Sequence, residues 1–109
     1  MTRLESIKLI GDLLTKIDVL RGSLMPDSPT RTALDRIRKS LDKKQLVLSQ
    51  NQFDDNTQEY INAAKKLEDI NKEVKKTISK IEKLVETIEN LKRLVGAVEN
   101  IIKVAIPFE

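Results

Sequence analysis

Apolar residues recur at steps of three and four along nearly the whole chain, which is the spacing of one face of an α-helix. The first run extends from Leu4 to Leu24. Thr2 and Glu5 have the spacing of a capping box at its start. Two prolines in residues 25–29 end the run, because proline disfavours a helical conformation in the residue before it. The pattern predicts a first helix over about residues 2–24.

A second helix is predicted over about residues 29–52. Ser28 and Pro29 have the order of an N-cap followed by a proline at the first helical position. The apolar stripe is Leu34, Ile37, Leu41 and Leu48, with Gln45 on the same face. The polar stretch that follows favours a short loop around Phe53–Asn56, in which Asn56 caps the next helix. No glycine or proline forces this turn, so a helix that continues through it is the alternative.

The last half of the chain reads as one long helix over about residues 57–105. It contains no proline, and its one glycine is Gly96. Such a helix would be roughly 72 Å long. The core-facing positions are Tyr60, Ala64, Leu67, Asn71, Val74, Ile78, Ile81, Val85 and Ile88, and then Leu91, Val95, Val98 and Ile102. Two successive three-residue steps end at Leu91, and such a stammer overwinds a supercoil locally.

These elements predict an all-α fold in a single domain over residues 1–109, with a helical hairpin and one long C-terminal helix in a coiled-coil-like bundle. Each helix of the hairpin is roughly 35 Å long and covers only half of the long helix. The remaining apolar face would be larger than soluble monomers usually expose, which predicts a homodimer, in one arrangement antiparallel. Leu91, Val95, Val98 and Ile102 are its expected interface, and Asn71, at a core position, is expected to set the register.

Composition excludes several kinds of chemistry. The chain has no cysteine and no histidine, which removes disulfides, thiolate nucleophiles, the commonest metal ligand and the usual general base. The cluster Asp54, Asp55 and Glu59 beside Asn56 offers oxygen ligands for a hard cation, but helix capping and loop solvation explain it better, because the EF-hand spacing is missing. We therefore expect no cofactor, no metal and no catalytic site. The first residues lack the apolar run of a secretory signal, so a cytoplasmic protein is expected.

Lysines form a stripe along one side of the predicted long helix, and the net charge of the chain is +3. This possible anion-binding face consists of Lys65, Lys72, Lys76, Lys80 and Lys83. Interleaved acids favour a solvated face over a binding site. The apolar run over residues 94–106 is too short and too charged to span a bilayer, although it could lie in the membrane interface.

The sequence therefore predicts a non-enzymatic helical oligomerisation or protein-interaction module. A peripheral membrane-binding or anionic-surface-binding protein is the alternative, together with a weak nonspecific nucleic-acid binder.

Overall fold

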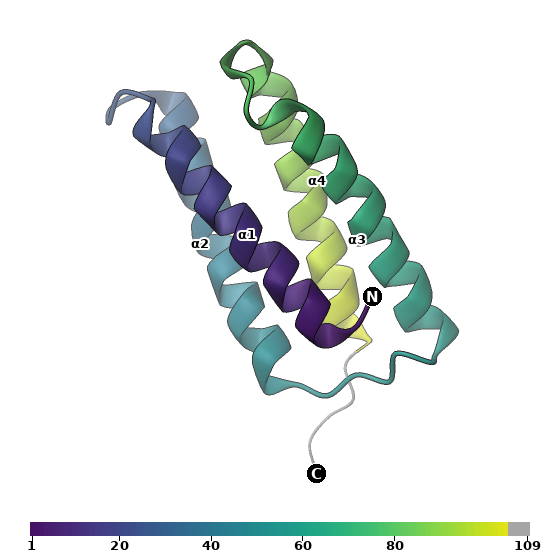
Figure 1. The fold of residues 1–109 in the computed structure, drawn as a ribbon. Helices are drawn as coiled ribbons and strands as arrows, with labels where there is room; N and C mark the ends of the chain where they lie inside the picture. Colours follow the sequence, from purple (N-terminus) through teal and green to yellow (C-terminus); the bar gives the residue numbers. More distant parts are fainter. Residues whose placement is uncertain (105–109) are drawn as a thin grey trace.

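Four α-helices make up most of the part of the chain that the computed structural model describes, residues 1–104 (Figure 1). The helices are α1 (Arg3–Gly22), α2 (Pro29–Gln50), α3 (Gln58–Thr77) and α4 (Leu84–Lys103), and a 3-10 helix, η1 (Ile81–Lys83), precedes α4. These residues contain no strand beside the helices. The predicted all-α class is confirmed.

The helices form two antiparallel hairpins, α1 with α2 and α3 with α4. The hairpins pack on each other mainly through α2 and α4. The loop from α2 to α3 crosses the end of the bundle, so that α1 and α3 run in the same direction (Figure 1). In contrast to the other neighbouring helices, α1 and α3 are not closely packed.

Two predicted helix starts are confirmed in atomic detail. The Thr2 hydroxyl accepts from the backbone N–H of Glu5, and the Glu5 carboxylate accepts from the N–H of Thr2, both at 3.2 Å. Ser28 accepts from the N–H of Arg31 at 3.0 Å ahead of Pro29.

The predicted cap of the next helix is wrong by one residue. The loop is present, but Thr57 rather than Asn56 caps α3, accepting from the N–H of Tyr60 at 3.3 Å. Asn56 instead donates its backbone N–H to the Asp54 carboxylate at 3.0 Å, which holds it in the turn before the helix.

The prediction of one continuous helix over residues 57–105 is wrong. The chain leaves α3 after Thr77, turns through residues 78–83 and returns as α4. Lys80 adopts an extended conformation (φ −110°, ψ 105°) in this turn. The buried Thr87 hydroxyl donates to the Thr77 hydroxyl at 2.8 Å and joins the two helices beside it. The predicted helix end, Ala105, lies outside the described residues.

The turn changes which face of the last segment is buried. Ile81 and Val85, which the predicted stripe placed in a helix seam, are 55% and 79% exposed. Beyond the turn, α4 buries Leu91 and Val98 of the predicted stripe, together with Leu94 and Ile101, while Val95 and Ile102 are only partly buried. The two short steps that end at Leu91 lie within α4, where Val85 is exposed and Leu91 is buried, so they do not mark a stammer in one continuous helix.

The core is aliphatic except for Tyr60, and it is shared by all four helices. Its fully buried members include Ile10, Ile17, Leu34, Leu41, Leu67, Val74, Leu91 and Val98. Since α4 folds back onto α3 and α2, no half of a long helix is left bare. The sequence argument for a homodimer, which rested on that bare half, loses its basis.

Tyr60 closes the core at the end of the bundle where α3 begins. Its ring lies 5.9 Å from that of Phe53, between centroids. Burial raises the pKa of Tyr60. Its hydroxyl is the one buried side-chain polar atom of residues 1–104 without a hydrogen-bond partner, and the neighbouring Ser6 donates to the carbonyl of Thr2 at 3.1 Å.

Candidate interaction surface

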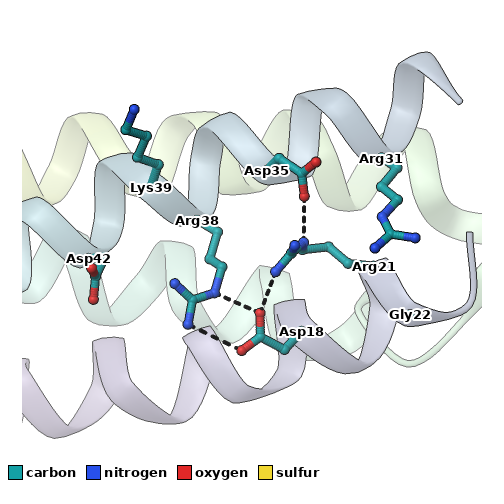
Figure 2. A pocket seen from close by; sticks show the side chains of 8 residues that line it. All are labelled: Asp18, Arg21, Gly22, Arg31, Asp35, Arg38, Lys39 and Asp42. Carbon is teal, nitrogen blue, oxygen red and sulfur yellow. Dashed lines mark hydrogen bonds and ion pairs between the residues drawn. The ribbon is translucent and has the colours of Figure 1, made fainter. Parts of the chain in front are cut away.

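Two long seams of the bundle expose charged side chains, and they differ in how these charges are used. The first seam lies between α1 and α2 (Figure 2). Asp18 of α1 accepts from the Arg38 guanidinium of α2 at 2.6 and 3.3 Å. Arg21 donates to Asp18 at 2.8 Å and also to Asp35 of α2. These ion pairs connect the two helices directly.

The charges of Asp18, Arg21, Asp35 and Arg38 neutralise one another across this seam. Hydrogen bonds from Arg38 hold the pKa of Asp18 below its usual value, and Asp18 in turn raises the pKa of Arg38. Arg31, at the loop end of the seam, donates to the carbonyl of Leu24 at 3.2 Å. The hollow is open to solvent, and its guanidinium groups are already occupied by carboxylates and a carbonyl. We therefore interpret the α1/α2 seam as a structural contact between two helices rather than a ligand site.

The second seam, between α1 and α3, is an open groove. It consists of two adjacent cavities of about 410 and 530 Å³. The first lies toward the start of α1, and Leu9, Leu13 and Asn71 contribute to its lining. The second lies toward the α3–α4 turn and is lined mainly by apolar groups, among them Val19, Leu20, Ile78 and Ile81. Lys16 and Lys75 line both cavities, so the two form one continuous groove.

Charged side chains on both walls of this groove form no ion pairs within residues 1–104. The walls carry Lys8, Asp12 and Lys16 on α1, and Glu68, Lys72 and Lys75 on α3. None of the ion pairs formed within residues 1–104 involves any of these six residues. The α1/α3 seam thus lacks the connections that close the α1/α2 seam.

Of the two halves of the groove, the cavity next to the α3–α4 turn should discriminate more strongly between ligands. Its only charged lining residues are Lys16 and Lys75, one from each helix. Two like charges that face a shared apolar hollow repel each other, and a carboxylate placed between them would interact favourably with both. The arrangement suits an apolar ligand that carries negative charge.

Four of the five residues predicted for the dimer interface lie outside the groove. Leu91 and Val98 are fully buried in the chain's own core, and Val95 and Ile102 are partly buried against it. Asn71 is 7% exposed and lines the groove within one chain. Leu91 and Val98 are therefore not available to a second copy while the bundle is folded.

The predicted lysine face is divided by the turn. Lys65, Lys72 and Lys76 lie on α3, whereas Lys80 and Lys83 belong to the turn and η1. Lys76 pairs with Glu73 at 3.0 Å, and Lys83 pairs with Glu86 at 3.6 Å. Of the five, Lys72 lines the groove.

Two lysines at the centre of the groove, Lys16 and Lys75, could not be singled out from the sequence. Each lies at the edge of an apolar stripe, but that signal is shared by most surface lysines. Their meeting depends on how α1 and α3 are placed side by side, which the sequence did not reveal.

In the acidic cluster of the loop, Asp54 accepts hydrogen bonds from the residues that follow it. Asp54 accepts from the N–H of Asn56 through its carboxylate and from Thr57 through its carbonyl. In the part of the chain that the structure describes, no three Asp or Glu side chains come together in a way that could hold a metal ion.

None of the helices within residues 1–104 has the length and apolar character needed to cross a membrane. Comparison of the chain with family models, with curated proteins and with solved structures finds no match. The function is therefore argued from the geometry alone.

Proposed function

We propose that the protein is a non-enzymatic protein-interaction module that binds an amphipathic, acidic helix in the groove between α1 and α3. The observation that carries this proposal is the contrast between the two seams. Ion pairs connect α1 to α2, whereas the α1/α3 groove has apolar lining groups and charged walls without partners among the described residues.

The shape of the groove favours a helix as its ligand. Two parallel helices border it, and its apolar groups follow one another from Leu9 and Leu13 to Leu20 and Ile78. An amphipathic helix places its apolar residues in such a groove at intervals of three and four. Acidic residues beside that apolar face would meet Lys16 and Lys75.

The lining residues favour a protein over a nucleic acid or a lipid surface. In the half of the groove toward the start of α1, Glu5, Asp12 and Glu68 alternate with Lys8, Lys16, Lys72 and Lys75, so the lining is a mixed-charge surface rather than the basic patch that a phosphate backbone or an anionic membrane favours. The lining residues of both cavities include no aromatic side chain on which a base could stack.

The test is a set of parallel titrations with three probes. The first is a designed helical peptide with leucine on one face and glutamate beside it. Phosphatidylserine-containing vesicles and duplex DNA are the others. The peptide should bind, and a scrambled peptide of the same composition should not. The double variant K16E/K75E should weaken peptide binding by about tenfold or more, corresponding to about 1.4 kcal/mol.

The matched control is K43E/K65E, which makes the same charge change at two exposed lysines outside the groove. It should bind the peptide as the wild type does. Equal losses in both variants would contradict the proposal, as would binding of vesicles or DNA in the absence of peptide binding.

A further inference from the structure

We infer that the helix bound in the α1/α3 groove runs antiparallel to both α1 and α3, and that its acidic residues lie in its N-terminal half and basic residues in its C-terminal half. This inference rests on the proposed function and specifies the direction and the charge order of its ligand. The ligand helix begins at the α3–α4 turn and ends beside the start of α1.

The two walls of the groove run in the same direction. Both α1 and α3 end at the cavity next to the α3–α4 turn (Figure 1). The lining of this cavity includes Leu20 and Ser23 at the end of α1, and Ile78 at the end of α3. From Glu5 to Ser23 the α1 wall is about 27 Å long, which matches a ligand helix of about 18 residues.

The helix dipoles of the two walls favour an antiparallel ligand. The carboxyl end of an α-helix carries a partial negative charge, and its amino end carries a partial positive charge. A ligand helix that begins at the turn therefore places its positive end between two negative ends. Among residues 1–104, α2 and α4, which run the other way, contribute no side chain to the lining of the two cavities. Their dipoles therefore oppose this arrangement only from a greater distance.

Polar side chains at the two ends of the groove favour the same direction. The first four backbone N–H groups of a helix have no partner within that helix. Ser23 and Ser79 line the turn end of the groove, and a hydroxyl oxygen can accept from such N–H groups. Ser23 keeps this capacity although it donates to the Leu20 carbonyl at 2.7 Å. At the opposite end, Lys8 can donate to the last carbonyl groups of the ligand.

The charges of the lining change along the groove and thereby select the charge order of the ligand. In the cavity next to the turn, the charged lining residues are Lys16 and Lys75. In the other cavity, Glu5, Asp12 and Glu68 stand among the lysines. An antiparallel ligand therefore meets the two lysines with its N-terminal half and the three acids with its C-terminal half. The same order stabilises the ligand helix itself, because acids are favourable near a helix start and bases near its end.

The first test measures the direction of the bound ligand. The designed leucine–glutamate peptide, with glutamates along its whole length, carries a spin label at its N-terminus. The chain has no cysteine, so the variants K80C in the α3–α4 turn and Q58C at the start of α3 each accept a single label. Pulsed electron–electron double resonance should place the peptide label nearer to residue 80 than to residue 58 by about 10 Å or more, because α3 alone is about 30 Å long. A label at the C-terminus of the peptide should reverse this order.

The second test measures the charge order. Two peptides share one composition and one leucine face. The ordered peptide has glutamates in its N-terminal half and lysines in its C-terminal half, and the reversed peptide has the opposite order. Both carry the same hydrocarbon staple, so that both are helical before they bind. The wild type should bind the ordered peptide about fivefold more tightly or better, a difference of about 1 kcal/mol.

The variant D12K/E68K should remove most of this preference, because it replaces two of the acids that face the C-terminal half of the ligand. The two peptides should then bind within about twofold of each other. The matched control is D69K/E89K, which makes the same charge changes at an exposed aspartate and an exposed glutamate outside the groove. It should keep the preference of the wild type.

The outcomes separate this inference from the proposed function. A peptide whose N-terminus lies nearer to residue 58, or that binds equally in both directions, overturns the inference. So does equal binding of the two charge-ordered peptides by the wild type, or a preference that D12K/E68K leaves unchanged. In each of these cases the proposed function stands if the leucine–glutamate peptide binds the wild type and not K16E/K75E. A wild type that binds none of the peptides overturns both.

Discussion

Gly11 and Gly96 differ in their effect on the stability of the fold, because their surroundings differ. Gly96 lies inside α4, is exposed, and a Cβ added there would meet no atom within 4 Å. Gly11 lies where α1 approaches α2, and a Cβ there would lie 3.3 Å from the Gln45 side-chain nitrogen. That nitrogen donates to the carbonyl of Ile7 at 3.0 Å. Gly96 thus weakens its helix without a packing role, whereas Gly11 makes room for a contact between helices.

The variant G96A should stabilise the protein by about 0.5–1 kcal/mol, because alanine loses less backbone entropy than glycine in a helix interior. G11A is the matched control, in which the same gain is opposed by displacement of Gln45. Urea unfolding followed by circular dichroism measures both. A decrease in stability for G96A, or an equal gain in both variants, would contradict this account of the two sites.

For single residues, predictions from the sequence are correct where the interacting groups lie close together along the chain. The Thr2 capping box and the Ser28–Pro29 start depend on side chains within three residues, and both are present. The buried face of α2 follows from its apolar spacing alone. Arg21 and Arg38 could not be assigned to Asp18 in this way, since their pairing depends on how two helices are placed side by side.

Among the helices, α1 and α2 are joined by the ion pairs of Asp18. The free energy of this connection depends on pH, because the ion pairs lower the pKa of Asp18 in the folded chain. A carboxyl group with a lowered pKa stabilises the fold above its unfolded pKa, about 3.9 for Asp. The contribution is lost as the pH falls through the lower, folded value.

The variant D18N should therefore lose about 0.5–1 kcal/mol of stability at neutral pH, a modest amount because the Asp18 side chain is 43% exposed. The difference from the wild type should shrink below about pH 4. Chemical denaturation at a series of pH values measures it. D69N, which removes an exposed carboxylate of α3 that lies in none of the ion pairs within residues 1–104, is the control. A deficit in D18N that persists unchanged at pH 2 would contradict this assignment.

The turn between α3 and α4 could not be predicted from the sequence. Residues 78–83 contain no glycine or proline, and the apolar steps from Ile78 to Ile88 are compatible with one helix. The chain folds back because two helices of 20 residues can bury their apolar faces on each other and on α2. This is a gain in tertiary packing, which outweighs the local preference for helix. The missed turn also concealed the groove, because the turn defines one of its ends.

For the whole molecule, the fold-back at residues 78–83 has two consequences. It lets one chain seal its own aliphatic core, so a partner is not required for folding. It also places α3 beside α1 without ion pairs between them in the described part of the chain, which leaves the groove open. The proposed interaction depends on this geometry.

The distance between residues 66 and 103 tests the fold-back most directly. Lys66 of α3 and Lys103 of α4 line the same hollow of the second hairpin. The chain has no cysteine, so K66C/K103C can be spin-labelled at these two sites alone and diluted with unlabelled protein to remove distances between copies. Pulsed electron–electron double resonance should give a distance between the two spin labels of under about 25 Å, because packed helices lie about 8–10 Å apart. A distance of about 55 Å, the span of one continuous helix between these residues, would contradict the fold and the groove built on it.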